Sequence, residues 1–133
     1  MRVVLDSSVL IAAAISRAGV CAGLLEDVLT HHEFVASEFI IEEVGRKLRD
    51  KFGFPGGAVR ELPGFLRRNA THAEPVALPD DACRDPAGLP VLGTAVAARA
   101  SILVTVDKDL LAIATFQGMD IIRPGEFWRR MTR

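Results

Sequence analysis

Two aspartates each follow a short run of apolar residues. Asp6 follows the run 2–5, and Asp107 follows the run 102–106. Runs of aliphatic and β-branched residues without polar alternation are typical of strands that are buried on both faces of a parallel sheet. Ligands of open α/β sheets bind beyond the carboxyl ends of the strands, so we expect the two acids to converge there. Clustered carboxylates require a cation, and the pair therefore predicts a Mg²⁺ or Mn²⁺ site.

Glu43 is a third acidic candidate, on a helix that is expected from Ser37 to about Phe52. The apolar side chains of this helix recur at i, i+4 spacing: Ile40, Val44, Leu48 and Phe52. At about 100° per residue, Glu43 borders that apolar face, whereas Glu42 points to the opposite side. An unpaired carboxylate beside a buried face is costly. Glu43 is therefore interpreted either as a metal or substrate ligand or as a side chain that extends to solvent.

Both aspartates also have a structural interpretation, because aspartate after a strand is a common helix N-cap. Ser7 and Ser8 follow Asp6 and could cap the next helix in its place, and both interpretations of Asp6 stay open. Thr105 lies two residues before Asp107. The period of two in a strand places these side chains on one side, which favours a functional role for Asp107.

Three further acids, Asp80, Asp81 and Asp85, lie in a polar loop that is expected at 79–88. Acids in loops are usually solvated. Asp85 is the exception that we select, because Pro86 stiffens the segment that leads into the next helix.

The elements that must position these residues follow from the apolar periodicity. Helices are expected at 9–15, 21–30, 37–52, 89–100 and 108–115, from 124 onward, and at 59–69 with a break at Pro63–Gly64. Strands are expected at 2–5, 33–36, 72–78, 102–105 and 119–122. This alternation predicts the α/β class, as a three-layer α/β/α sandwich with a parallel sheet of four or five strands. The length of 133 residues suits one domain, 1–133.

The charge balance excludes a strongly basic protein. The net charge is −1, so any contact with nucleic acid would depend on local basic groups. Three such groups occur, namely Arg46, Lys47, Arg49 and Lys51, then Arg67 and Arg68, and finally Arg129, Arg130 and Arg133. Each is interpreted as a solvated helix face. Together they would form a rim that holds the phosphates of a polyanion around the acidic crevice.

Other chemistries lack their sequence signatures. His31, His32 and His72 show no metal-ligand spacing, and no glycine-rich phosphate loop or nucleophile motif occurs. Cys21 and Cys83 are expected to be free thiols. The sequence has no secretory signal, and its longest apolar stretch, 9–15, is too short to span a membrane. A cytoplasmic protein without membrane contact is expected.

Five segments, in order, resemble those of the PIN-domain family of metal-dependent ribonucleases. They are residues 4–10 around Asp6, 37–48 around Glu43, 84–95 with Asp85, 104–111 around Asp107, and 121–127. The resemblance covers nearly the whole chain. It is closest to the toxin components of bacterial toxin–antitoxin pairs that are related to virulence-associated protein C. No segment is specific alone, and the order of all five carries the resemblance.

The resemblance implies a divalent-metal-dependent endoribonuclease toxin that hydrolyses RNA phosphodiesters. Asp6, Glu43 and Asp107 would be the metal site for Mg²⁺ or Mn²⁺, with Ser8 and Thr105 as polar neighbours. The implied partners are RNA, a cognate antitoxin that lies across the apolar helices at 9–29, and a second copy of the chain in a homodimer.

One position departs from the family pattern. The family usually has an aspartate shortly before the alanine that Ala95 matches, and Gly88 stands there in this sequence. Asp85 would replace it as a catalytic acid. The alternative is a catalytically degenerate PIN domain that binds RNA or a protein partner without cleavage. A phosphoacceptor receiver domain is a third hypothesis, but the chain lacks a clearly placed acceptor aspartate and a lysine on a separate last strand.

Overall fold

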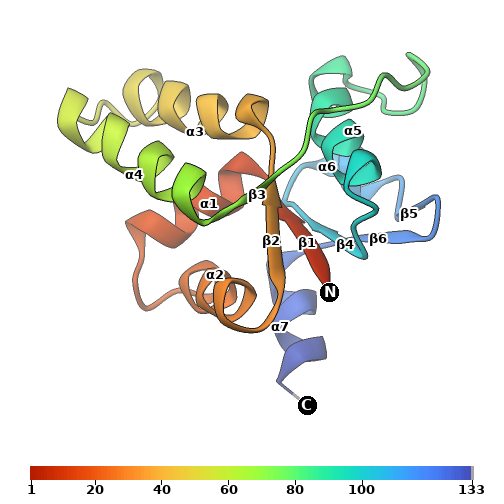
Figure 1. Cartoon of the computed structure of the whole chain (residues 1–133), viewed down its shortest axis with the longest axis horizontal. Coiled ribbons are helices and arrows are strands. Elements are labelled where there is room, and N and C mark those ends of the chain that lie inside the picture. The colour runs from red at the N-terminus through yellow and green to blue at the C-terminus, as the bar shows by residue number, and fades with distance from the viewer. Residues whose placement is uncertain (133) are drawn as a thin grey trace.

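Strands from both halves of the chain form one central sheet in the computed structural model, which describes residues 1–132 (Figure 1). The strands are β1 (Arg2–Leu5), β2 (Glu33–Ala36), β3 (Thr71–His72), β4 (Ile102–Val104), β5 (Thr115–Phe116) and β6 (Met119–Ile122). Their order across the sheet is β3-β2-β1-β4-β6-β5. Every neighbouring pair is parallel except β5 and β6, which are antiparallel.

Helices flank this sheet on both sides. They are α1 (Ser7–Ile15), α2 (Val20–His31), α3 (Glu38–Asp50), α4 (Gly56–Asn69), the 3₁₀ helix η1 (Pro86–Gly88), α5 (Leu89–Ala97), α6 (Lys108–Leu111) and α7 (Pro124–Met131). Figure 1 shows α2 and α7 on one side of the strands and α5 and α6 on the other. The α/β class with a mostly parallel sheet is therefore confirmed.

The two apolar runs of the sequence form the centre of the sheet. Val3, Val4 and Leu5 of β1 are fully buried, as are Leu103 and Val104 of β4. This burial on both faces confirms the prediction from their unalternating apolar pattern. Leu5 pairs with Val104 in register, so the residues that follow the two strands start from adjacent positions.

The sheet has six strands rather than the four or five predicted, because a hairpin adds β5 at one edge. Phe116 pairs with Met119, so the chain reverses at Gln117–Gly118. These two residues have positive φ values of 49° and 83°, as a two-residue type I′ turn requires. The helix predicted at 108–115 therefore ends early, and the chain enters β5 through Ala114 at a φ of 64°. The helix predicted at 89–100 also ends early, at Ala97, because the backbone of Arg99 has a positive φ of 52°.

The strand predicted at 72–78 is limited to β3. Pro75 interrupts the run, and proline cannot donate to a ladder. The Val76 N–H donates instead to the Gly93 carbonyl of α5, at 3.2 Å. A Cβ built on Gly93 would lie only 2.5 Å from the Val76 carbonyl oxygen, so this close approach of two backbones requires glycine.

α4 is one continuous helix, and the predicted break at Pro63 is wrong. Proline removes one helical hydrogen bond, here the one that the Val59 carbonyl would accept. Gly45 of α3 packs against this part of α4. A Cβ built on Gly45 would lie 3.4 Å from Pro63 Cγ and 3.7 Å from the Val59 carbonyl oxygen. The close packing of α3 on α4 thus buries Pro63 and stabilises the helix through it.

No helix within residues 1–132 is by itself long and apolar enough to cross a membrane. The consecutive helices α1 and α2 are together long and apolar enough, but they are bent by 109° relative to each other.

Candidate functional site

The carboxyl ends of β1 and β4 meet at Asp6 and Thr105. The Thr105 hydroxyl donates to Asp6 Oδ2 at 2.7 Å. The Ser7 N–H donates to Asp6 Oδ1, also at 2.7 Å, so Asp6 begins α1 as its N-cap. Asp6 and Thr105 are both buried. Residues that are distant in sequence therefore converge at this edge of the sheet, as the two apolar runs predicted.

α3 brings Glu43 to the same place. Ser37 caps α3 by accepting the Ile40 N–H at 3.3 Å, and it also accepts the Thr94 hydroxyl of α5 at 2.8 Å, so the start of the helix is fixed. One turn further, the Ser7 hydroxyl donates to Glu43 Oε1 at 2.5 Å. A single residue, Ser7, thus connects Asp6 through its backbone with Glu43 through its side chain.

Asp6, Glu43 and Asp107 line one cavity of about 240 Å³. The other lining residues are Ser8, Lys47, Ala87, Gly88, Val91, Val106 and Leu110. The cavity is therefore built from α1, α3, the η1–α5 segment and the loop after β4. Three predicted acids and Ser8 share it, and Thr105 lies behind Asp6.

Lys47 is a member of this cavity that sequence reasoning placed on a solvated basic face. Its Nζ donates to Ser7 Oγ at 2.9 Å and lies 3.4 Å from Ser8 Oγ. The same atom is 3.5 Å from Glu43 Oε1. The available signal was its spacing, because Lys47 follows Glu43 at i+4, where side chains of one helix meet.

Burial dominates the electrostatics of Asp6. It raises the pKa of this carboxyl above its usual value, against the lowering effects of the Thr105 hydroxyl, the Ser7 N–H and the charge of Lys47. The nearby Glu43 carboxylate raises the pKa further. The ionised form of Asp6 is thus less favourable in the folded chain than in the unfolded chain.

Asp6→Asn is therefore expected to increase the free energy of unfolding of the metal-free protein at neutral pH. Because the pKa of Asp6 is raised on folding, wild type loses stability as the pH rises through that value, whereas asparagine stays neutral. The gain should shrink as the pH falls toward the ordinary aspartate pKa of 3.8. Urea denaturation of both proteins in chelator, from acidic to neutral pH, measures the difference. A variant that is less stable than wild type at neutral pH would contradict this account.

Asp107 both caps a helix and lines the cavity. Its Oδ1 accepts the N–H groups of Asp109 at 2.8 Å and Leu110 at 3.1 Å, at the start of α6. The Asp107 N–H donates to the Thr105 hydroxyl oxygen at 3.0 Å. The capping interpretation is therefore correct for one oxygen, and among residues 1–132 no donor contacts the other. Asp107 thus keeps one oxygen for a ligand in the cavity.

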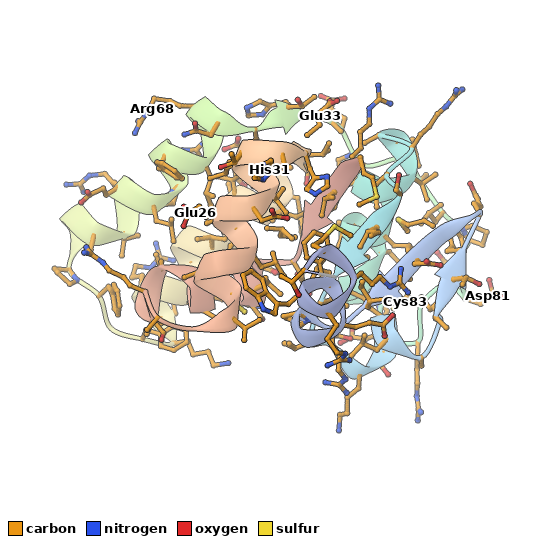
Figure 2. All side chains as sticks on the ribbon, turned by 90° about the horizontal axis from the view of Figure 1, so that it is seen from below. Glu26, His31, Glu33, Arg68, Asp81 and Cys83 are labelled. Carbon is orange, nitrogen blue, oxygen red and sulfur yellow. The ribbon has the colours of Figure 1, made fainter. Side chains whose placement is uncertain are left out.

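Asp85 does not join the other acids. It is exposed, its Oδ1 accepts the Ala87 N–H at 3.0 Å at the start of η1, and it is not among the residues that line the cavity. Asp80 and Asp81 are also exposed, and Figure 2 shows Asp81 at the margin of the molecule. The geometry gives the expected catalytic role of Asp85 no support.

The Cys83 side chain packs against Gly88, the position at which a fourth acid was expected. A Cβ built on Gly88 would lie 2.8 Å from Cys83 Sγ and 3.2 Å from Leu110 Cδ2. Cys83 is buried, and burial raises the pKa of its thiol, with further increases from the charges of Asp107, Asp109 and Asp85. An aspartate at position 88 would therefore need the sulfur atom to move.

Several basic residues outside the cavity form surface ion pairs. Arg49 pairs with Asp50, and Arg67 pairs with Glu38. Arg130 pairs with Asp120 and Glu126, at 3.0 and 2.6 Å. Arg68 lies on α4 on the opposite side of the molecule from Cys83 in Figure 2, and Arg133 lies outside the described residues. Among residues 1–132, Lys47 is the basic side chain that lines the cavity, and Arg46 lies 3.4 Å from Glu43 Oε2.

The donor chemistry of the cavity suits a hydrated hard cation. Three carboxylates and the Ser8 hydroxyl line one part of it, beside glycine and apolar residues. Mg²⁺ typically keeps several waters while it binds one or two carboxylates directly. Within residues 1–132 no group of three acidic, histidine or cysteine side chains is close enough to enclose an ion. The residues thus fit a divalent ion that is held by one or two carboxylates, and they do not form a closed cage.

The fold and this cavity together define a mostly parallel α/β protein with acidic residues at the carboxyl ends of its strands. Residues 2–109 match the family model described as PIN domain. The chain therefore belongs to the PIN-domain family, whose members are generally nucleases.

Two solved structures have the same fold. VapBC2 from Rickettsia felis, determined with a DNA fragment from its promoter, superposes with a TM-score of 0.64 at 10% identity, over 92% of this chain and 98% of that chain. PAE2754 from Pyrobaculum aerophilum superposes with a TM-score of 0.61 at 20% identity, over 100% of this chain and 91% of that chain. No curated protein matches the sequence.

Proposed function

We propose that this chain, as one domain of residues 1–133, is a divalent-metal-dependent endoribonuclease and the toxin of a toxin–antitoxin pair. The observation that supports the proposal most is the shared cavity of Asp6, Glu43 and Asp107 in a chain of the PIN-domain family. A magnesium or manganese ion, when held by these carboxylates, would stabilise charge on the phosphoryl group and lower the pKa of an attacking water.

The side chains around the cavity have separable roles in this proposal. Thr105 holds one oxygen of Asp6, and Ser7 holds one oxygen of Glu43, so both carboxylates keep a fixed orientation toward the cation. Ser8 lines the cavity and offers a hydroxyl to the RNA. In the hydrolysis, a bond forms from a water oxygen to phosphorus, and the bond from phosphorus to O3′ breaks. Water loses a proton to solvent and O3′ gains one, which leaves a 5′-phosphate and a 3′-hydroxyl.

The test is cleavage of end-labelled RNA by the purified protein. We expect cleavage with Mn²⁺ or Mg²⁺, none with excess chelator, and product fragments that carry a 5′-phosphate. The absence of cleavage with either metal across several single-stranded and structured RNAs would contradict the proposed activity.

A non-enzymatic function is the second candidate, and Gly88 favours it. Gly88 supplies no carboxylate to the cavity, and Cys83 fills the adjacent space. In this reading the cavity binds RNA or a protein partner without cleavage.

Gly88→Asp with Cys83→Ala is the variant that tests this alternative. Gly88→Asp alone should destabilise the fold by about 1–3 kcal/mol through overpacking, because its Cβ would meet Cys83 Sγ. Removing the sulfur should restore most of that loss in thermal unfolding. If wild type binds RNA without cleaving it and the double variant cleaves, the domain is degenerate. Cleavage by wild type refutes degeneration, and Cys83→Ala alone is the control.

An antitoxin and a second copy of the chain are the protein partners that we propose, in the cytoplasm. The support for the antitoxin is an apolar groove beside the cavity, which Ile11, Ala12, Ile15 and Phe52 line. Ile15 and Phe52 are exposed large apolar residues. The groove fits the apolar face of a partner helix. A small reading frame next to the gene, and an enlarged complex on co-expression, would support the pair, and light scattering of the isolated chain would determine whether it dimerises.

A further inference from the structure

Lys47 places a positive charge inside the acidic cavity. It lies on α3, one turn after Glu43, and its Nζ is within 3.5 Å of Ser7 Oγ, Ser8 Oγ and Glu43 Oε1. About a third of the side chain, 32%, is exposed. The ammonium group is thus held by three oxygens from two helices while it stays accessible from the cavity.

The carboxylates leave little protein ligation for more than one divalent ion. Asp107 gives one oxygen to the cap of α6, and Asp6 accepts a hydrogen bond on each of its oxygens. Residues 1–132 hold no group of three acidic, histidine or cysteine side chains that could enclose an ion. A second divalent ion would also be repelled by the Lys47 ammonium, because like charges a few ångströms apart interact strongly where water is excluded.

One divalent ion and one ammonium match the charge of the cavity. Together they neutralise the three carboxylates, so an incoming phosphodiester meets no net negative charge. An ammonium has three donors. Its hydrogen bonds to Ser7 Oγ and Ser8 Oγ take two of them, which leaves one donor for a ligand in the cavity. Lysine is a common phosphate ligand that acts as a point charge.

We propose that Lys47 is a catalytic residue that takes the place of a second cation. Its ammonium contacts a non-bridging oxygen of the scissile phosphate, while a single divalent ion is held by the carboxylates. This inference rests on the proposed nuclease function of the same cavity. Lys47 also orients the Ser8 hydroxyl toward the same phosphate, since the two groups are 3.4 Å apart.

A competing role for Lys47 predicts the opposite result. An ammonium that only fills the metal position would have to leave before the metal binds. Its removal would then tighten metal binding and increase cleavage.

The experiment compares wild type with Lys47→Met, Lys47→Arg and Arg99→Gln. Arg99 is the control, because it is exposed on the turn between α5 and β4, at the amino ends of the strands, away from the cavity. Calorimetry with Mn²⁺ alone should give one ion per chain in all four proteins. At saturating Mn²⁺, Lys47→Met should cleave RNA roughly 100-fold more slowly, as for the loss of one charge-stabilising group. Lys47→Arg should recover part of that rate, and Arg99→Gln should match wild type.

RNA binding provides the readout that does not depend on turnover. In Ca²⁺, the affinity for a short single-stranded RNA should fall less steeply with salt in Lys47→Met, by about 0.7 in the log–log slope for one lost phosphate contact. Two Mn²⁺ ions per wild-type chain, an unchanged slope, or faster cleavage by Lys47→Met would overturn the inference. If wild type cleaves no RNA, the nuclease proposal fails, and the salt slope still decides whether Lys47 contacts phosphate.

Discussion

Glu43→Gln is expected to reduce RNA cleavage by at least about a thousandfold at saturating Mn²⁺. In the proposed function it removes a charged ligand of the ion that activates water and stabilises the transition state. Glutamine keeps the size of the side chain and can still accept the Ser7 hydroxyl, which donates to Glu43 Oε1 at 2.5 Å. The fold should therefore be retained. The loss would then report the missing negative charge rather than a collapsed cavity.

Glu42→Gln is the matched control for this variant. Glu42 is the adjacent residue on α3, is exposed, and does not line the cavity. Single-turnover cleavage of end-labelled RNA by both variants, with circular dichroism to verify folding, measures the difference. Equal losses in the two variants, or cleavage by Glu43→Gln at the wild-type rate, would contradict the assignment of Glu43.

Gly93→Ala is expected to lower the free energy of unfolding by about 2–4 kcal/mol, the range for overpacking together with a lost buried hydrogen bond. The new Cβ would lie 2.5 Å from the Val76 carbonyl oxygen and 3.3 Å from the Val76 nitrogen. Both atoms are backbone, so no rotamer change can relieve the contact. The segment around Val76 must move away from α5 and lose its hydrogen bond to the Gly93 carbonyl.

Gly57→Ala serves as the comparison for this stability prediction. Gly57 lies in the first turn of α4 and has open space around its Cα. Alanine there should be neutral or stabilise the protein by up to about 1 kcal/mol, because it favours the helix and restricts the unfolded chain. Urea denaturation of both variants tests the pair. A Gly93→Ala protein as stable as wild type would mean that the segment around Val76 is not tightly packed on α5.

The sequence was sufficient to predict the part of the site that depends on strand ends. Burial on both faces gives β1 and β4 an unmistakable apolar pattern, and parallel pairing brings their carboxyl ends together. The convergence of Asp6 and Asp107 on one cavity could therefore be predicted from their positions after the strands. The place of Glu43 beside the cavity could be predicted from helical periodicity, because a position at the border of the apolar face of α3 directs it toward the core.

Lys47 and Cys83 were missed because their environments depend on distant segments. Lys47 follows the charge pattern of an exposed helix face, and only the packing of α1 on α3 places its ammonium between two serines and Glu43. Cys83 lies in a loop of polar residues, and nothing in its neighbours indicates that its sulfur packs against Gly88. The i+4 spacing from Glu43 was the only local sign of the position of Lys47, and Cys83 had no periodic signal.

The errors in the fold have similar causes. The β5–β6 hairpin depends on two residues with positive φ, Gln117 and Gly118. Asparagine, aspartate and glycine favour such a turn, whereas glutamine does not, so the sequence did not predict it. α4 continues through Pro63 because Gly45 of a different helix allows close packing there. In both cases tertiary contacts outweigh a local preference.

The hydrogen bond from Thr105 to Asp6 joins residues that are 99 positions apart in the sequence. During translation, a ribosome-bound chain that has not yet exposed β4 carries Asp6 and Glu43 but lacks both Thr105 and Asp107. Such a nascent chain has no completed cavity and should be inert toward the messenger that encodes it. If the proposed nuclease function is correct, activity would begin only after β4 and Asp107 have been synthesised.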